Sequence, residues 1–258
     1  MQTPEAPTVA HAATARGKDV PVRDDLREWH RALLDHLRHP GCWFSGAERL
    51  AIAAESRHAP ACPLCRERTA ALSPEHARGA HERVSDRALL PDPVVEIAHR
   101  VRTDSGRLSR AWFERILASG IAPGPYVEVV GVVALLAGLD HFCRALGSTP
   151  LPLPEAAPGE PSKHTPAGLR DDIAWVPILA PEDASGPEAD LYDEAAVIPN
   201  IARALSSVPD HVRMLQRLTR SHYLALADMR NPAAGRAIDR MQIELVAARV
   251  SALNECFY

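Results

Sequence analysis

Aromatic residues are scarce in this sequence, and so is any sign of a strongly basic face. Only 5% of the 258 residues are aromatic, whereas 46% are hydrophobic and alanine fills many of the apolar stretches. Strands favour β-branched and aromatic residues, and alanine is the strongest helix former. The net charge is -4 and the arginines are interleaved with acidic residues, so nothing indicates the concentrated positive charge that nucleic-acid binding requires. The composition therefore predicts an all-α fold and no nucleic-acid partner.

The sequence also shows no secretory signal and no membrane-spanning run. The segment 1–20 has no apolar stretch of the kind that a secretory signal needs. The most apolar run, Val127 to Leu139, is interrupted by Glu128 and is shorter than the about 20 residues that cross a bilayer, so we expect a buried core helix. The five cysteines are an odd number, which argues against a disulfide scaffold. We expect a cytoplasmic protein without membrane contact.

Proline divides the chain. Nine of the 23 prolines lie between Pro150 and Pro187, which predicts a Pro-rich linker over 148–192 with an anchor at Ile173–Trp175–Val176. We expect a flexible tail over 1–21, a first helical domain over 22–147 and a second over 193–258. Apolar periodicity, caps and breakers predict helices over 23–38, 47–57, 62–72, 93–101, 109–119, 126–146, 198–207, 209–229 and 236–258, with another beginning at Pro74.

The motif Cys62-Pro63-Leu64-Cys65 carries the clearest chemistry. Two cysteines three residues apart on a helical turn have Cα atoms about 5 to 6 Å apart, which permits a disulfide. A helix N-terminus stabilises the thiolate of a cysteine that begins the helix, and proline suits the position after it. Such a pair can attack a peroxide, form a sulfenic acid and close to a disulfide. The motif predicts a redox-active thiol pair.

Two other interpretations of this motif remain open. Cys62 and Cys65 can complete a structural zinc site with Cys42 and His58, although no second CxxC or HxxxH accompanies them. Alternatively, both thiols are inert residues of the core, as buried cysteines often are. We interpret Cys143, like Cys42, as a core thiol without a partner.

Glu48 is the first candidate for a proton relay to the cysteines, because it lies on the alanine-rich helix that leads into the motif. The alternative is structural: Ser45 and Glu48 have the spacing of a capping box. Glu55, two turns further on about the same face, can replace Glu48 as the relay. Further along the chain, His141 and the neighbouring Asp140 lie on the late apolar helix, where a hydrogen-bonded structural role is more typical than catalysis.

Two more histidines fall on the helix that is expected to begin at Pro74. They are His76 and His81, and we expect both to face solvent.

The two ends of the chain contain similar sequence patterns. Glu244 precedes Cys256 by 12 residues, and Glu48 precedes Cys62 by 14, each on a similar apolar stretch. The stretch from Glu244 to Tyr258 resembles the signature of the alkylhydroperoxidase D-like and carboxymuconolactone decarboxylase-like superfamily. There a glutamate twelve residues before a CxxC leads into a paired-thiol site, and a histidine follows four residues on. The stretch from Gly46 to Cys65 resembles a more divergent copy of the same signature.

The resemblance implies an all-α fold of two such helical halves and a homo-oligomer. It also implies peroxide reduction by a thiol pair, with a glutamate and histidine relay and recycling by a dithiol donor such as a lipoyl-bearing or thioredoxin-like protein. Matched residue by residue, Cys62 and Cys65 are the pair and Glu48 is the relay glutamate. Cys256 and Glu244 belong to a second site. In such peroxidases the second cysteine of the pair can be the one that meets peroxide, whereas the helix terminus favours Cys62, so the order stays open.

The sequence departs from the family pattern at two positions, and each departure leads to a further prediction. Thr69 stands where the relay histidine would fall in the first copy, so His58, His141 or Arg68 must replace it or that copy is slow. The sequence ends at Tyr258, directly before the second cysteine of the other motif. We hypothesise that the next codon is UGA and specifies selenocysteine. The alternatives are a deliberate end of the expressed segment, a frameshift, or a short variant whose last helix packs on a partner subunit.

The function predicted from the sequence is therefore thiol-dependent reduction of a hydroperoxide. This prediction includes no metal ion and no cofactor. A non-catalytic module that senses oxidation or holds zinc is the alternative. A lactone decarboxylase with the same fold is the third possibility, and the intact pair of Cys62 and Cys65 argues against it because that reaction needs no CxxC.

Overall fold

The computed structural model describes residues 12–15, 18–192, 198, 200–254 and 256. Helices dominate this part of the chain, which confirms the predicted all-α class. In chain order the α-helices are α1 (Asp24–Arg38), α2 (Gly46–His58), α3 (Pro63–Ala70), α4 (Asp92–Asp104), α5 (Arg110–Ala118), α6 (Pro123–Ala145), α7 (Asn200–Arg203), α8 (Pro209–His222) and α9 (Arg240–Leu253).

Shorter elements connect these helices. The 3-10 turns are η1 (Pro74–His76), η2 (Ser105–Arg107), η3 (Pro181–Asp183), η4 (Gly186–Glu188) and η5 (Leu226–Arg230). Two antiparallel pairs of strands complete the elements, namely β1 (Ala12–Ala15) with β2 (Lys18–Pro21) and β3 (Leu169–Arg170) with β4 (Ile178–Leu179). The first pair lies inside the segment for which the sequence predicts a flexible tail.

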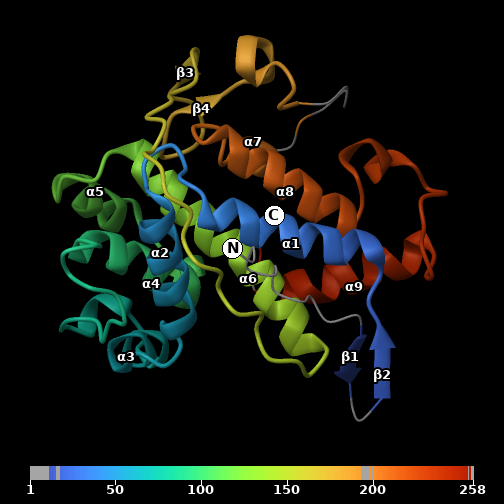
Figure 1. Ribbon diagram of the computed structural model, residues 1–258, viewed down its shortest axis with the longest axis horizontal. Helices are drawn as coiled ribbons and strands as arrows, with labels where there is room; N and C mark the ends of the chain where they lie inside the picture. The colour runs from blue at the N-terminus through green and yellow to red at the C-terminus, as the bar shows by residue number, and fades with distance from the viewer. Residues whose placement is uncertain (1–11, 16–17, 193–197, 199, 255, 257–258) are drawn as a thin grey trace, which may run out of the picture.

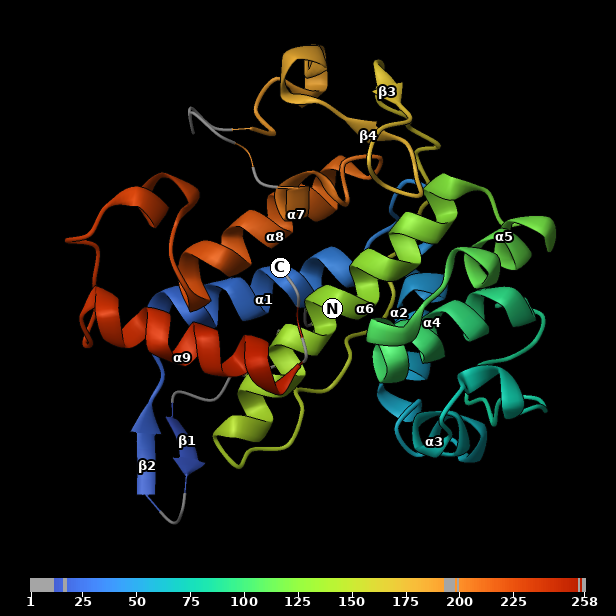
Figure 2. The same cartoon turned by 180° about the vertical axis from the view of Figure 1, so that it is seen from behind.

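The central helix α6 organises the core. Its residues Leu135, Leu136 and Leu139 are fully buried, and α1, α2, α4 and α8 all pack around it. Figures 1 and 2 show α1, α6 and α8 crossing the middle of the molecule, with α2 to α5 gathered at one end. Among the described helices, α6 alone is long and apolar enough to cross a membrane, yet 67% of its most apolar window is buried inside the protein. This burial is that of a core helix, as the sequence predicts.

Helix α8 shares this core. Val208 and Val212 are buried in the same apolar cluster as Leu33 of α1. The indole Nε1 of Trp29 also donates a hydrogen bond to the backbone oxygen of Met214, at 3.3 Å. The helix ends at His222 rather than at residue 229 as predicted, because Tyr223 leaves the helical backbone conformation.

The Pro-rich segment 148–192 lies against the protein along the turn between α1 and α2. The backbone N–H groups of Ala157, Ser162 and Lys163 donate to the carbonyl oxygens of Arg38, Gly41 and Cys42, respectively, at 2.8 to 3.0 Å. Further along the segment, the predicted anchor is only partly buried. Val176 is buried, as are the nearby residues Ile178 and Leu179, whereas Ile173 is 64% exposed. Proline removes backbone donors, so this segment is held by a few such contacts and a short strand pair rather than by a helix.

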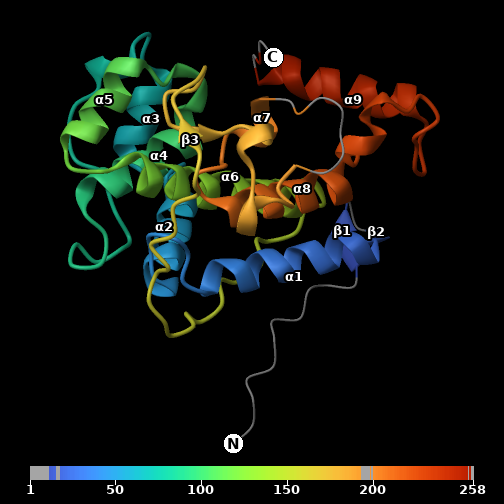
Figure 3. The same ribbon diagram turned by 90° about the horizontal axis from the view of Figure 1, so that it is seen from above.

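Helix α9 exposes many of its large apolar side chains. Ile243 is its buried residue, while five large apolar side chains are more than half exposed: Met241, Leu245, Val246, Val250 and Leu253. Exposed apolar side chains gathered in this way often mark an interaction surface. Figure 3 shows that α9 and the CxxC helix α3 lie at opposite ends of the molecule.

Candidate functional site

The CxxC motif lies at the start of α3, as the sequence predicts. Cys62 is the residue that precedes the helix, and Pro63 occupies its first position. Proline is favoured there because the first N–H of a helix has no partner within it. Cys65 follows one turn later, and both cysteines are reduced thiols that are at most 2% exposed. The local fold therefore directs both sulfur atoms into the protein.

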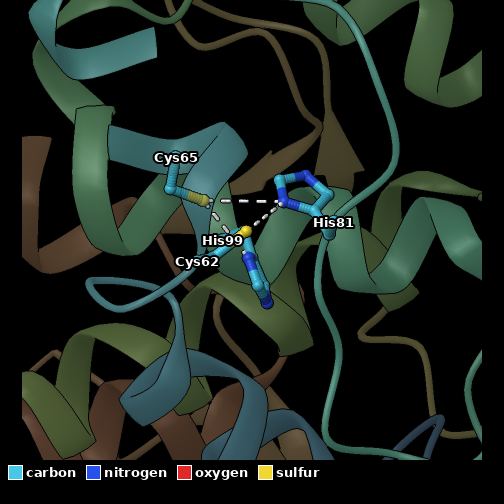
Figure 4. A group of neighbouring side chains, drawn as sticks. All are labelled: Cys62, Cys65, His81 and His99. Carbon is cyan, nitrogen blue, oxygen red and sulfur yellow. Dashed lines mark hydrogen bonds between the residues drawn. The ribbon is translucent and has the colours of Figure 1, made fainter. Parts of the chain in front are cut away.

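Two histidines complete a cluster with these thiols. His81 comes from the irregular loop that follows η1, and His99 comes from the middle of α4. His81 Nδ1 lies 3.6 Å from Cys62 Sγ and 3.5 Å from Cys65 Sγ, and His99 Nδ1 lies 3.2 Å from Cys65 Sγ. All four donor atoms lie within 4.8 Å of one another. Figure 4 shows the four side chains converging from three different parts of the chain.

Each histidine also contacts a carboxylate, through the ring nitrogen that faces away from the sulfur atoms. His99 Nε2 lies 2.9 Å from Glu55 Oε2, and His81 Nε2 lies 2.7 Å from Glu96 Oε2. An ionised carboxylate only accepts hydrogen bonds, so both Nε2 atoms are the protonated ones. In each neutral ring the Nδ1 lone pair is therefore left facing the sulfur atoms.

Glu96 has two further partners. Arg68 donates to its Oε2 atom at 2.8 Å, and Trp112 Nε1 donates to its Oε1 atom at 2.9 Å. Because Glu96 and His99 are three residues apart on α4, they share one face of that helix. This face of α4 therefore contributes one donor atom and one supporting carboxylate to the cluster.

Glu55 also holds the loop that carries His81. Its Oε1 atom accepts hydrogen bonds from the backbone N–H groups of Val84 and Ser85, at 3.0 and 2.7 Å, and from the Ser85 hydroxyl. The Glu55 side chain is fully buried. One carboxylate thus fixes both the orientation of the His99 ring and the path of the loop after η1.

The environments of the two thiols differ. Burial alone would raise the pKa of Cys62, but hydrogen bonds from the Cys65 backbone N–H and from His81 outweigh it, so the pKa is lower than usual. Burial and the neighbouring Cys62 raise the pKa of Cys65 to about 12.

The two histidines also differ. Burial lowers the pKa of His99 to about 4 and keeps the ring neutral at pH 7. For His81, burial is outweighed by Glu96 and Cys62, which raise its pKa. The two pKa values thus shift toward each other, because each of these groups stabilises the charged form of the other.

A pocket of about 460 Å³ reaches Cys65 from the surface. Its lining includes the cationic side chains of Arg66, Arg102 and Arg144, together with His141. A second pocket, of about 600 Å³, lies on the far side of His81 and Glu96. Cys65 therefore lies in the wall of the first pocket, whereas Cys62 lies behind it.

Glu48 does not reach the cysteines. Its carboxylate accepts hydrogen bonds from the Ser45 backbone N–H and hydroxyl at 2.8 and 2.7 Å, which completes a capping box at the start of α2. Glu55 is seven residues further along, about 10 Å at the rise of an α-helix, and it is the glutamate next to the site. Of the two roles considered for Glu48, the structure shows the structural one.

The C-terminal residues Glu244 and Cys256 do not join the cluster either. Glu244 accepts a hydrogen bond from the Tyr223 hydroxyl at 2.7 Å and pairs with Arg240. Cys256 is exposed after the end of α9, outside the cluster of Cys62, Cys65, His81 and His99. Position 257 and Tyr258 lie outside the described residues.

The prediction for His81 was wrong. The helix expected from Pro74 ends after one 3-10 turn at His76, so the chain turns back and brings His81 to the thiols. The zinc alternative also named the wrong partners for the CxxC pair. Cys42 is buried beside Glu128 in the turn before α2, and His58 pairs with Glu82 at 3.1 Å.

His99 and Glu96 are absent from the candidates chosen by sequence, although a signal for them exists. Glu96 interrupts the apolar run from Val94 to Ala98, and His99 follows this run directly. In the structure His99 is fully buried. Buried polar residues on an apolar face are satisfied by partners, which makes them candidates for a site. Asp140, by contrast, has the expected structural role and pairs with Arg57 at 2.8 Å.

In comparisons with protein-family models, with curated proteins and with solved structures, nothing matched this chain.

Proposed function

We propose that this protein is a thiol-dependent hydroperoxide reductase in which Cys62 and Cys65 form the redox couple. The observation that carries the proposal is the approach of His99 Nδ1 to Cys65 Sγ, at 3.2 Å, with Glu55 holding the other ring nitrogen. A thiol, a neutral imidazole and a buried carboxylate in this order can remove the thiol proton when the sulfur must act as a nucleophile. In this proposal His99 of α4 takes the role of the relay histidine, because Thr69 stands at the position where the family motif has that histidine.

The reaction follows from these groups. One thiolate attacks the distal oxygen of the hydroperoxide, the O–O bond breaks, and the departing alkoxide takes a proton to leave as an alcohol. The attacking cysteine becomes a sulfenic acid. The second thiol then loses its proton to a neighbouring histidine and attacks that sulfur, and hydroxide leaves as water when it takes the proton. Two thiols have been oxidised to a disulfide, and a peroxide has been reduced to an alcohol and water.

The pocket beside Cys65 supports both substrate entry and recycling. An external dithiol restores the pair by thiol–disulfide exchange and becomes a disulfide itself. A pocket of about 460 Å³ is large enough for a slender dithiol arm, such as a lipoyl group, but too narrow for the folded surface of a reductant protein. The cations of Arg66, Arg102 and Arg144 favour hydroperoxides that carry an anionic group.

The resemblance to the alkylhydroperoxidase D-like superfamily is part of this proposal. Its support is the helical fold, the CxxC at the start of a helix, and a glutamate and histidine beside the thiols. The exposed apolar side chains of α9 support the homo-oligomer that the resemblance implies, because burial against another subunit would remove them from water.

The test is peroxide consumption by the reduced, metal-free chain with dihydrolipoamide as electron donor. Cys62→Ser and Cys65→Ser should each abolish turnover, whereas Cys143→Ser, a buried thiol on α6, should retain it. Mass spectrometry after peroxide treatment should find a disulfide between Cys62 and Cys65 in the wild type. Turnover that survives in both of the first two variants, or a wild type that neither consumes peroxide nor forms the disulfide, would refute the proposal.

A further inference from the structure

We propose that Cys62, Cys65, His81 and His99 form a tetrahedral zinc site. The inference goes beyond peroxide reduction, because it requires only that the four side chains bind a cation together. Their donor atoms are two sulfurs and two imidazole nitrogens, all within 4.8 Å of one another. Two thiolates and two imidazoles are a common donor set for zinc and a poor one for magnesium or calcium, which prefer oxygen.

The distances between these atoms match those around a zinc ion. Zinc bonds are about 2.3 Å to sulfur and about 2.0 to 2.1 Å to nitrogen, so sulfur and nitrogen ligands of one tetrahedral ion lie about 3.6 Å apart. Three sulfur-to-nitrogen separations in the cluster are 3.6, 3.5 and 3.2 Å. Figure 4 shows the four side chains pointing toward one another. These three pairs thus have the spacing of ligands of one ion, and since all four atoms lie within 4.8 Å of one another, small side-chain rotations would let a single ion contact them all.

The surroundings of the two histidines support the same conclusion. Each ring directs Nδ1 to the centre and donates its Nε2–H to a carboxylate, Glu55 for His99 and Glu96 for His81. Carboxylates placed in this way fix the tautomer and orientation of histidines that bind zinc. Two thiolates and one Zn²⁺ sum to zero charge, so the buried centre would carry no net charge with neutral histidines.

The fold around the cluster contains a long irregular loop, which Glu55 holds at Val84 and Ser85. Residues 77–91 form a loop of about fifteen residues without a helix or strand, which is long for a compact protein. The apolar cluster beneath it is small and consists of Ala59, Cys62, Leu64, Cys65 and Ala77. A zinc ion bound by His81 from the loop, the CxxC from α3 and His99 from α4 would tie these three segments together. Zinc with four protein ligands is typical of structural sites.

The zinc-bound pair and the disulfide are mutually exclusive states, because a disulfide uses both thiolates. A hydroperoxide and two protons would convert the zinc-bound pair into a disulfide, a free zinc ion, an alcohol and water. This consequence rests on the proposed peroxide chemistry, whereas zinc binding itself does not. Zinc would then protect the thiols until an oxidant releases it.

The test uses the full, reduced chain and zinc alone, titrated against a competing chelator without peroxide. We expect one zinc per chain with nanomolar or tighter affinity. Cobalt in its place should give tetrahedral d–d bands and a thiolate-to-cobalt charge-transfer band. Cys62→Ser and His81→Ala should weaken zinc binding at least 100-fold, whereas the matched controls Cys143→Ser and His76→Ala should not change it. Glu96→Gln should weaken it about 10- to 100-fold through the orientation of His81.

A second measurement covers the case in which a ligand variant fails to fold. Limited proteolysis of the wild type should cut within residues 77–91 after zinc is removed, and added zinc should restore protection. Wild-type protein that binds no zinc, or that gives no thiolate-to-cobalt band, would overturn the inference, as would ligand variants that bind zinc like their controls. Zinc binding without peroxide turnover by the zinc-free chain would refute only the proposed reductase. Turnover without zinc binding would refute only the metal site.

Discussion

His99 Nε2 lies 2.9 Å from Glu55 Oε2, and both side chains are fully buried although 44 residues separate them in the chain. The contact joins α2 to α4 and sets the direction of the opposite ring nitrogen, which faces Cys65. Because the other carboxylate oxygen holds Ser85, one side chain positions both the histidine and the loop. Glu55 is therefore a positioning residue of the candidate site.

Replacing Glu55 by glutamine should lower kcat for peroxide at least tenfold while changing KM little. The amide keeps the shape but removes the negative charge that stabilises a protonated His99, and a base of this kind contributes about 10² to 10⁴ in rate. Steady-state rates over a range of pH would measure the effect, with Glu82→Gln as the matched control because Glu82 is a largely exposed partner of His58. An unchanged kcat and pH profile in Glu55→Gln would contradict the relay.

Ser45→Ala and Glu48→Ala should lower the free energy of unfolding and leave peroxide turnover unchanged. Both residues form the capping box of α2. Loss of a cap typically costs about 1 kcal/mol. Urea unfolding and the peroxide assay would be made on the same preparations. Loss of turnover in a folded Glu48→Ala variant would restore the relay role that the sequence left open.

Gly131 and Gly138 on α6 offer a matched test of how α8 packs. A Cβ atom at Gly131 would lie 2.6 Å from the His211 ring on α8, whereas at Gly138 the nearest atom, a Leu218 methyl group, is 3.5 Å away. Gly131→Ala should destabilise the protein by about 1 to 3 kcal/mol through overpacking. Gly138→Ala should be neutral or stabilising, because alanine is favoured by up to about 1 kcal/mol within a helix. Equal unfolding free energies for the two variants would contradict this packing.

Stability should fall as the pH drops below about 6.5, the usual histidine value. Burial lowers the pKa of His30 and of His222 to about 4, and that of His36 to about 3. Below pH 6.5 the unfolded chain therefore binds protons that the folded chain does not bind. Each of these histidines then lowers the free energy of unfolding by up to about 1.4 kcal/mol per pH unit, until the pH reaches its pKa in the folded protein.

Urea unfolding at pH 7.5, 6.0 and 5.0 would measure this loss before most carboxylates titrate. His30→Phe provides the comparison, because the His30 ring packs against Trp29 and Phe142 with centroids 5.4 and 4.8 Å away. The variant should lose less stability between pH 7.5 and 5.0 than the wild type. A stability that does not change over this range in the wild type would contradict the burial of neutral histidines.

Much of the local structure follows from residues that are close in sequence. Alanine-rich periodicity and caps predict the main helices, because their hydrogen bonds join residues four apart. The CxxC pair, the capping box at Ser45 and the buried α6 are all of this kind. Burial of Cys42 and Cys143 also follows from their apolar surroundings.

The tertiary structure alone decides which distant groups meet. Packing of α2 on α4 brings Glu55 to His99, and the return of the chain after η1 brings His81 to the thiols. Packing of α8 against α1 and α6 likewise joins the C-terminal part of the chain to the core. Periodicity shows which face of a helix is buried, but it carries no information about the partner across the interface or the path of an irregular loop. For this reason the sequence determined the helices and the thiol pair, whereas the path of the chain in space determined the four-residue cluster around that pair.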